Sequence, residues 1–279
     1  MNWKLEELDE QIVKDRIASY IASGSKLLNE RQLLQTILSS IDLTTLEGSD
    51  TDQKAKELCK AARSFKKNGT DIPNVAAVCF YPPFAALAKA QLKDYGINVA
   101  CVAGAFPSGQ SPLPVRIAEV EYTVEQGADE IDMVISRGKF LQGDYDYIYN
   151  EVKEIKQACG DAHLKVILET GELHDLNKVK LASEIAIAAG ADFIKTSTGK
   201  MQPAATLEAF TVMLDVIKAH YDRTGVMIGI KPAGGISEVS VAKEYIYVLE
   251  NVLGEKWMNN TWFRIGASRL ANKALQELM

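Results

Sequence analysis

The sequence has few of the residues that bind metals or form disulfides, with three histidines and four cysteines among 279 residues. His163, His174 and His220 lie far apart and form no His-x-x-x-His pair, so the ligand pattern of a zinc enzyme is missing. The cysteines show neither paired metal-ligand spacing nor the density of a secreted disulfide framework. We therefore expect no metal and a reducing, cytoplasmic environment.

Long apolar runs and basic clusters are missing as well. No run reaches the roughly 20 apolar residues that cross a membrane, and the polar, acidic N-terminus does not resemble a signal peptide. The formal net charge is −6, and no Lys/Arg cluster is interleaved with aromatic residues, which argues against a nucleic-acid surface. A hydrophobic share of 47% with 24% charged residues is typical of a folded globular protein. These features predict a soluble protein without nucleic-acid or membrane partners.

Short apolar runs alternate with amphipathic stretches along most of the chain. After a helical stretch over about residues 5–38, eight runs have the length of strands, at 40–43, 75–80, 99–103, 130–134, 164–168, 192–196, 226–231 and 263–266. Stretches with helical spacing lie between them, at 51–65, 112–125, 145–158, 178–188, 205–219 and 239–253. Eight strand–helix units predict an α/β protein with a closed (β/α)8 TIM barrel. An open doubly wound sheet is the alternative, but the turn after the first strand lacks a dinucleotide-binding glycine fingerprint.

We expect a single barrel domain over residues 1–279, in which residues 41–279 form the barrel and residues 1–40 an N-terminal helical extension. The extension should bury one apolar stripe, formed by Leu5, Leu8, Ile12 and Ile17. With this stripe it would pack against the bottom of the barrel or against a neighbouring subunit. A homo-oligomer is compatible with the sequence, which does not define the oligomeric state.

Two lysines are expected at the rim of the barrel, where the carboxyl ends of the strands meet and catalytic groups are found. Lys195 closes the sixth apolar run and Lys231 the seventh. Burial and a nearby cation both lower the pKa of an ammonium group, and a neutral amine can attack a carbonyl carbon to form a Schiff base. The alternatives are a lysine that simply reaches solvent, or two lysines that bind an anion without covalent chemistry.

Carboxylates occur in the fourth apolar run, where each needs a partner if it is buried. A rim lysine is the expected partner of Asp132. Strand alternation places Glu130 and Asp132 on one face and Asp129 on the other, so position alone does not choose between them, and Asp129 is expected to cap a helix or lie at the surface. Cys79, in the second run, is either a small core residue or a thiol that lines a pocket.

Glycines follow the last four strands, at Gly171, Gly199, Gly234, Gly235 and Gly266. Glycine lets backbone amides approach a ligand closely, and the loops after strands seven and eight of a barrel often hold a phosphate group. Lys200 would add a positive charge there. Each glycine by itself is ordinarily a turn residue, but their clustering predicts an anion site.

Together these segments resemble the deoxyribose-phosphate aldolases of the DeoC family, which are class I aldolases with a (β/α)8 barrel. The resemblance covers about residues 41–271. It includes Ile-Asp-Leu-Thr-Thr-Leu at 41–46, Val-Cys-Phe-Tyr-Pro at 78–82, Glu-Ile-Asp at 130–132, Leu-Glu-Thr-Gly-Glu-Leu at 168–173, Phe-Ile-Lys-Thr-Ser-Thr-Gly-Lys at 193–200, Lys-Pro-Ala-Gly-Gly at 231–235 and Ile-Gly-Ala-Ser at 265–268. The motif at 193–200 is the most specific of these.

The resemblance implies that Lys195 forms the Schiff base, that Lys231 perturbs it and that Asp132 takes part in proton transfer. Other residues that match pocket positions are Cys79, Asp42, Thr44 and Thr170. The positions around the substrate phosphate correspond to Gly199, Lys200, Gly234, Gly235, Gly266 and Ser268. The implied reaction is reversible cleavage of 2-deoxy-D-ribose 5-phosphate into D-glyceraldehyde 3-phosphate and acetaldehyde, in deoxyribonucleoside and carbohydrate catabolism, without a cofactor or metal.

The sequence departs from the family pattern at three places. Ser237 stands where many relatives have an arginine that reaches the phosphate, and Arg269 stands where relatives often have serine or threonine. We hypothesise that Arg269 replaces the missing positive charge. Some relatives also end in a tyrosine that reaches the active site, whereas no tyrosine follows Tyr247 here.

Two other functions fit the residues. Schiff-base chemistry specifies the lysine better than the substrate, so another class I aldolase acting on a related sugar phosphate is the first alternative. A non-catalytic barrel that binds a phosphate ligand is the second, because a fold alone does not establish catalysis.

Overall fold

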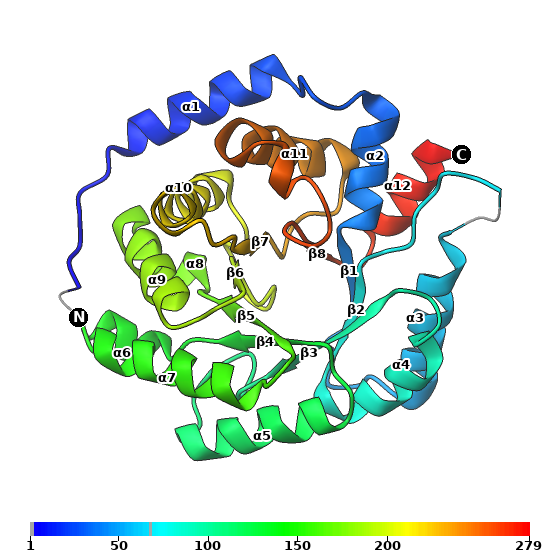
Figure 1. Ribbon diagram of the computed structural model, residues 1–279, viewed down its shortest axis with the longest axis horizontal. Coiled ribbons are helices and arrows are strands. Elements are labelled where there is room, and N and C mark those ends of the chain that lie inside the picture. Colours follow the sequence, from blue (N-terminus) through cyan, green and yellow to red (C-terminus); the bar gives the residue numbers. More distant parts are fainter. Residues whose placement is uncertain (1–2, 67–68) are drawn as a thin grey trace.

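Eight parallel strands form the centre of the molecule in a computed structural model that describes residues 3–66 and 69–279 (Figure 1). They are β1 (Ile41–Thr44), β2 (Ala77–Phe80), β3 (Asn98–Ala103), β4 (Glu130–Val134), β5 (His163–Ile167), β6 (Phe193–Lys195), β7 (Gly229–Lys231) and β8 (Ile265–Ala267). Each coincides with one of the eight runs expected from the sequence. All are short and mostly buried, as is typical of strands in a barrel interior.

The sheet closes on itself. Its strand order is β7-β6-β5-β4-β3-β2-β1-β8, and parallel bridges from Ile230 to Phe263 and from Ala233 to Gly266 connect its two ends. The predicted (β/α)8 barrel is therefore confirmed, and the open sheet is wrong. Closure brings the carboxyl ends of all eight strands to one rim.

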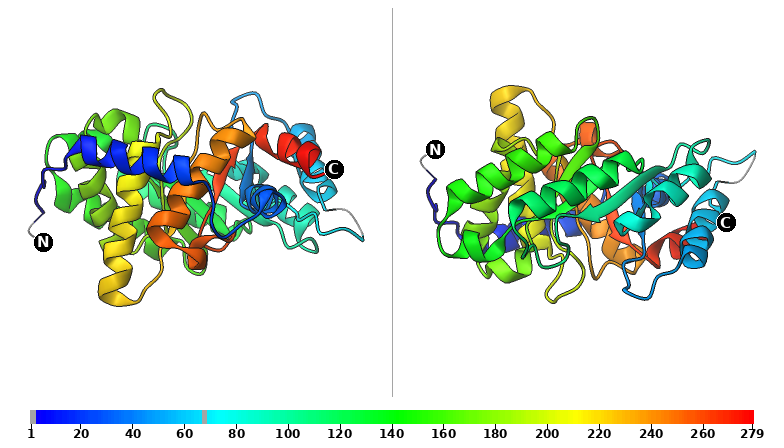
Figure 2. Two further views of the ribbon diagram at one scale, coloured as in Figure 1. Left: turned by 90° about the horizontal axis from the view of Figure 1, so that it is seen from above. Right: turned by 90° about the horizontal axis from the view of Figure 1, so that it is seen from below.

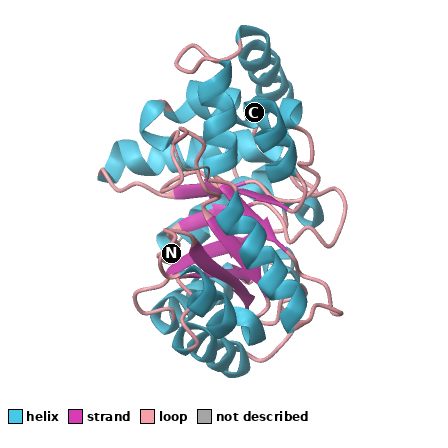
Figure 3. Ribbon diagram, turned by 90° about the vertical axis from the view of Figure 1, so that its right-hand side faces the viewer, coloured by secondary structure: helices cyan, strands magenta, loops and turns pink. Residues whose placement is uncertain are grey.

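A ring of helices surrounds the strands, as Figures 2 and 3 show from the side. The six expected helices are α3 (Asp52–Ser64), α5 (Leu113–Glu125), α7 (Tyr145–Ala158), α9 (Leu176–Ala188), α10 (Leu207–Thr224) and α11 (Val239–Leu253). Shorter ones are α4 (Ala85–Leu92), α6 (Arg137–Leu141), α8 (Thr170–Leu173) and α12 (Leu270–Leu278). Side-chain caps at Thr51, Asp175 and Thr206 accept amide hydrogen bonds that the first turn of a helix leaves free. Within residues 3–66 and 69–279, no helix has the length and apolar content needed to span a bilayer.

Side-chain alternation divides the core into two parts. In β4, for example, Ile131 and Met133 pack in the large cluster between strands and helices, whereas Val134 belongs to a smaller cluster inside the barrel. That inner cluster consists of Leu46, Ala77, Cys79, Ala100, Val102, Phe106, Val134 and Ile167. The remaining inward positions of β4 are Glu130 and Asp132, so charged groups occupy part of the barrel interior.

The N-terminal extension forms two helices, α1 (Glu10–Ser23) and α2 (Glu30–Ser39), instead of one continuous stretch. Helix α1 begins only after Asp9, whose carboxylate accepts hydrogen bonds from the amides of Gln11 and Ile12. It ends at Gly24, which has a positive φ of 61°. Residues 3–9 therefore approach α1 in a non-helical conformation.

The expected apolar stripe of the extension is only partly correct. Ile17 is buried, but Leu5 is 49% and Ile12 is 57% exposed, and the buried partner of Ile17 is Val13. Leu5 precedes the helix, so helical spacing does not apply to it. Helix α1 lies across the outer helices α10 and α11 rather than against the bottom of the barrel (Figures 1 and 2). Arg16 fixes it there with two hydrogen bonds to Asp215 on α10, of 2.8 and 2.7 Å.

Two isoleucines on α1 test this packing. Ile17→Ala should lower the free energy of unfolding by about 2 kcal/mol, because it leaves a cavity against the barrel. Ile12→Ala removes the same atoms from an exposed position and should change it by less than about 0.5 kcal/mol. Urea unfolding followed by circular dichroism gives both values. Equal losses in the two variants would mean that α1 is not held by the buried face described here.

Candidate active site

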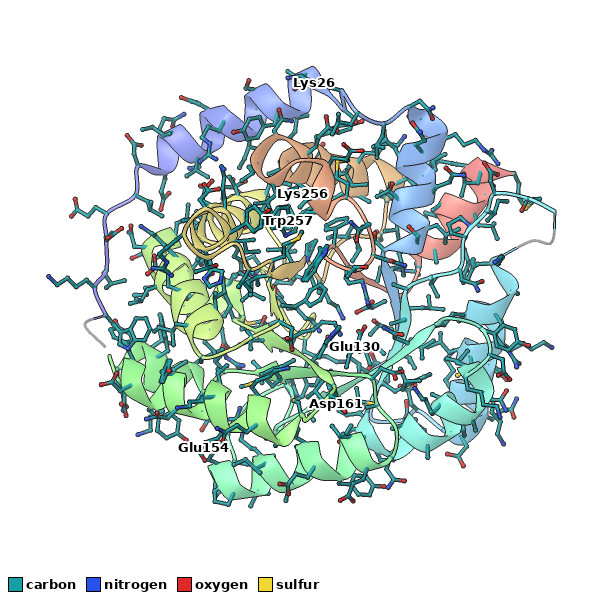
Figure 4. All side chains as sticks on the ribbon, in the orientation of Figure 1. Lys26, Glu130, Glu154, Asp161, Lys256 and Trp257 are labelled. Atoms are coloured by element: carbon teal, nitrogen blue, oxygen red, sulfur yellow. The ribbon has the colours of Figure 1, made fainter. Side chains whose placement is uncertain are left out.

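Seven ionisable groups gather inside the barrel and form what we call the charged cluster: Asp42, Glu130, Asp132, Lys165, Lys195, Lys231 and Arg264. They come from β1, β4, β5, β6, β7 and the residue that precedes β8. None is more than 5% exposed. Figure 4 shows Glu130 near the centre of the ring of strands. Burial of this many charges is tolerated only if each has partners.

Asp132 is the centre of the charged cluster. Its Oδ2 accepts hydrogen bonds from Lys195 Nζ and from Lys231 Nζ, each at 2.7 Å, and its Oδ1 accepts one from Lys165 Nζ at 2.8 Å. Burial alone raises the pKa of Asp132, but the three ammonium groups outweigh burial and hold the pKa well below its usual value. Asp132 is therefore a carboxylate, and its charge organises the three lysines.

A second layer of ion pairs lies deeper in the barrel. Arg264 donates to Asp42 at 2.8 Å and to Glu130 at 2.7 Å, and Glu130 also pairs with Lys165 at 2.5 Å. Asp42 in turn accepts a hydrogen bond of 2.5 Å from Lys231. Burial raises the pKa of Asp42, but Lys231 and Arg264 outweigh it and the pKa falls below its usual value. This layer keeps Asp42 ionised beneath Lys231.

The charges of the cluster do not balance. Four cationic groups face three carboxylates, so the fully ionised cluster carries one surplus positive charge. Lys195 has one carboxylate within 4 Å, whereas Lys231 has two and Lys165 has three. Lys195 is therefore the lysine whose proton is held least firmly.

The pKa shifts follow this arrangement. Burial lowers the pKa of Lys195, Asp132 opposes this, and the nearby ammonium of Lys231 lowers it further, so that the net shift is downward. For Lys231 burial has the same effect, but Asp132 and Asp42 together outweigh it and the pKa rises. The pKa of Lys165 also rises, because Asp132 and Glu130 outweigh burial. The site thus pairs one easily neutralised amine with a lysine that stays charged.

A cleft of about 830 Å³ opens above the charged cluster, and Lys195 forms part of its wall. The ends of β1 and β8, the loops after β1, β6, β7 and β8, and the start of α3 supply the other walls. These walls include the expected site residues Thr44, Gly199, Lys200, Gly234, Gly235, Gly266 and Ser268, together with Ser237 and Arg269. The structure therefore brings every expected phosphate-site residue to the same cleft as Lys195. Its volume suits a small ligand.

Unused amide donors mark one part of this cleft. In the described part of the chain, the backbone N–H groups of Gly199, Gly235 and Ser268 meet no acceptor. Gly234 and Gly199 adopt positive φ angles of 86° and 79°, and a Cβ on Gly234 would lie 2.6 Å from the Cβ of Ala204. The two loops can approach this closely only with glycine at Gly234. Converging amides without acceptors, next to cationic side chains, form a site for an anion.

Comparison with known proteins identifies the family. Residues 36–245, well over half of the chain, match the model of the DeoC/LacD family aldolases. The chain belongs to this aldolase family.

Named relatives support this membership. Human deoxyribose-phosphate aldolase and the mouse protein of the same name are each 44% identical over 240 residues, which cover 82% of this chain and 76% of each relative. Among solved structures, one titled "QR15, an Aldolase" has a TM-score of 0.71 at 30% identity and covers 87% of this chain and 96% of its own. Deoxyribose phosphate aldolase from Aeropyrum pernix, described as tetrameric, has a TM-score of 0.66 at 26% identity, with 90% and 98% covered.

Some expected site residues of this aldolase do not line the cleft. Asp42, Asp132 and Lys231 lie beneath it in the charged cluster, and Cys79 is fully buried in the inner apolar cluster, where burial raises the pKa of its thiol. Thr170 is 6% exposed and begins α8. Gly171, in α8, is not part of the cleft wall; a Cβ there would lie 2.0 Å from the carbonyl oxygen of Pro203, so this glycine allows α8 to pack against the loop that carries Pro203.

Sequence reasoning missed Lys165, Arg264 and Glu169. Lys165 alternates with apolar residues in β5 and is the register partner of Asp132 on β4, and that alternation is the signal that could have found it. Arg264 stands between apolar residues in the last run. Glu169 is 1% exposed, with a positive φ of 54°, and its carboxylate accepts hydrogen bonds from the amide and hydroxyl of Thr198 at 3.1 and 2.5 Å. Glu169 therefore fixes the loop that follows Lys195.

The pH dependence of adduct formation tests the role of Lys231. Lys231→Met removes the cation that lowers the pKa of Lys195 and leaves Asp132 more available to the Lys195 ammonium. Both changes raise the pKa of Lys195, so the limb of the profile on which this amine loses its proton should move to higher pH, by about one pH unit or more. Trapping of acetaldehyde with cyanoborohydride, measured against pH, gives the profile. Lys200→Met is the matched control and should leave the limb in place; an unmoved limb in Lys231→Met would contradict the assignment.

Proposed function

We propose that this chain is a class I aldolase that cleaves 2-deoxy-D-ribose 5-phosphate reversibly into D-glyceraldehyde 3-phosphate and acetaldehyde. One observation carries the proposal. Lys195, the lysine with the fewest carboxylate partners and a lowered pKa, lines a cleft that also contains free amides and cationic side chains. A nucleophilic amine and an anion site in one cleft match an aldehyde that carries a phosphate. The names of the human and mouse relatives support this substrate.

The reaction begins with Lys195. Its neutral amine attacks the C1 aldehyde of the open-chain sugar, and loss of water from the carbinolamine gives an iminium ion. The positive nitrogen then draws electrons as the C2–C3 bond breaks and the C3 hydroxyl gives up its proton. D-Glyceraldehyde 3-phosphate leaves, and an enamine remains on Lys195. Protonation of the enamine at C2 and hydrolysis of the resulting imine release acetaldehyde and free the amine.

We assign the proton transfers to Asp132 and Lys231, acting through a water. Both lie within hydrogen-bonding distance of one another, and Lys195 shares the same oxygen of Asp132, so protons are exchanged next to the reacting nitrogen. General acid–base catalysis of this kind typically contributes about 10² to 10⁴ in rate. Lys165 bonds to the other oxygen of Asp132, and Arg264 bonds to Asp42 and Glu130, so we assign these two residues the role of holding the carboxylates in place.

We place the phosphate at the amides of Gly199, Gly235 and Ser268, with Lys200 and Arg269 as the cations.

We also infer a cytoplasmic location and a role in deoxyribonucleoside and carbohydrate catabolism. The four cysteines, all buried and free, suit a reducing compartment. A homo-oligomer is part of the same proposal, because a structural neighbour is described as a tetramer.

Borohydride reduction in the presence of acetaldehyde tests the covalent step. The wild-type chain should gain one stable adduct, and peptide mass mapping should locate it at Lys195. Lys195→Met should gain none, whereas Lys200→Met, which keeps the reactive amine, should still be labelled. Absence of an adduct in the wild type would favour the non-catalytic phosphate-binding barrel, and turnover of other sugar phosphates in preference to 2-deoxy-D-ribose 5-phosphate would favour the related aldolase.

The contribution of Arg269 can be measured separately. Arg269 lines the cleft beside Ser268, so Arg269→Ala should raise KM for 2-deoxy-D-ribose 5-phosphate about tenfold, as expected for a lost charge-assisted hydrogen bond. KM for unphosphorylated deoxyribose should not change. Lys273→Ala is the control, because Lys273 lies in the first turn of α12, directly after Arg269, but is paired with Glu238 outside the cleft. Equal effects of Arg269→Ala on both substrates would count against a phosphate contact.

A further inference from the structure

An ion pair spans the mouth of the cleft. Lys200 Nζ, in the loop after β6, donates to Glu47 Oε1, in the loop after β1, at 2.9 Å. Both residues line the cleft. Around the closed barrel, β7 and β8 lie between β6 and β1, so this pair reaches past the two loops that carry Gly235 and Ser268. It therefore connects opposite sides of the site proposed for the phosphate.

Several hydrogen bonds stabilise the turn that carries Glu47. Asp50 accepts hydrogen bonds from the amide of Glu47 and from the hydroxyl of Thr45, each at 3.0 Å. The amide of Asp50 in turn donates to the carbonyl of Glu47 at 3.0 Å. Thr51 then caps α3. This bracing holds the backbone of Glu47 at the mouth, while its side chain is 69% exposed and contacts Lys200.

The other half of the pair is also fixed by its backbone. The amide of Lys200 donates to Thr198 Oγ1 at 3.1 Å, and Thr198 is held by the buried carboxylate of Glu169. The Lys200 side chain, 31% exposed, points to Glu47. Two hydrogen-bonded loops thus present two partly exposed side chains of opposite charge to one another across the cleft.

We propose that Glu47 is a specificity-determining residue that competes with the substrate phosphate for Lys200. The inference rests on the proposed phosphate site. A phosphate with two negative charges next to Gly199 attracts Lys200 more strongly than one exposed carboxylate does, so the Lys200–Glu47 pair breaks when the phosphate binds. Glu47 then loses its partner and faces an anion. Loss of the ion pair and repulsion by Glu47 therefore weaken the binding of every phosphorylated ligand, but not that of an unphosphorylated ligand.

The kinetic signature is a change in KM confined to phosphorylated substrates. At low ionic strength, Glu47→Gln should lower KM for 2-deoxy-D-ribose 5-phosphate about two- to fivefold, which is the range for an exposed ion pair, with kcat unchanged. KM for deoxyribose should stay the same. Glu57→Gln is the matched control: Glu57 lines the same cleft and loses the same charge, but the structure pairs it with Gln53 and not with a lysine.

A double-mutant cycle separates the ion pair from the general field of the cleft. In a Lys200→Ala background, Glu47→Gln should no longer lower KM, because there is no Lys200 ammonium for Glu47 and the phosphate to compete for. The proposal is overturned if Glu57→Gln lowers KM as much as Glu47→Gln does, or if the effect of Glu47→Gln persists without Lys200. Either result would assign the effect to overall negative charge at the mouth.

Binding of inorganic phosphate, measured by isothermal titration calorimetry, distinguishes failure of this inference from failure of the proposed function. Glu47→Gln should bind phosphate more tightly than the wild type by the same factor, whether or not 2-deoxy-D-ribose 5-phosphate is cleaved. Tighter binding without cleavage would leave the competition standing and reject the proposed reaction. Cleavage with unchanged phosphate affinity and unchanged KM would reject the competition alone.

Discussion

The carboxylate of Asp132 is the group on which the rest of the site depends. It receives hydrogen bonds from three buried lysines that come from three different strands. Without it, three ammonium groups would share a space that excludes water, and removal of one partner from a buried ion pair costs about 3–5 kcal/mol. Because the carboxylate is shared, the state of each lysine depends on the others. Lys195 has no second carboxylate among the described residues, and it is the lysine whose pKa falls.

The deeper ion pairs and the reactive amine form one electrostatic system. Arg264 and Lys165 satisfy Asp42 and Glu130, so Asp42 remains ionised and keeps Lys231 charged. The charged Lys231 then disfavours a charge on Lys195. Inward-facing positions of a barrel make this possible, because alternation sends residues of neighbouring strands to the same interior while their neighbours in sequence pack against the helices. The buried layer, which does not line the cleft, therefore contributes to the chemistry at the rim.

The strands and most helices were predictable because each is encoded locally, by an apolar run or by helical spacing, and the residues at the ends of β6 and β7 followed from the fold. Contacts across the barrel could not be predicted from the sequence. Lys165 and Arg264 are single charges in apolar runs, and their partners become neighbours only through closure. Leu5 was assigned to a buried stripe because the sequence does not show that the helix begins at Glu10. Ile12 was assigned to it although it lies five residues from Ile17; Val13, four residues from Ile17, shares the buried face. The pairing of Glu47 with Lys200 likewise depends on two loops 153 residues apart.

The N-terminal segment acts as a belt around one side of the barrel. Trp3 bonds to Asp146 on α7, Arg16 to Asp215 on α10, and the amide of Lys26 to Glu250 on α11. Of these helices, α10 connects β6 to β7 and α11 follows β7, and Lys195 on β6 and Lys231 on β7 are register partners. The helices next to these two strands are therefore tied together from outside, by a segment that contributes no residue to the chemistry.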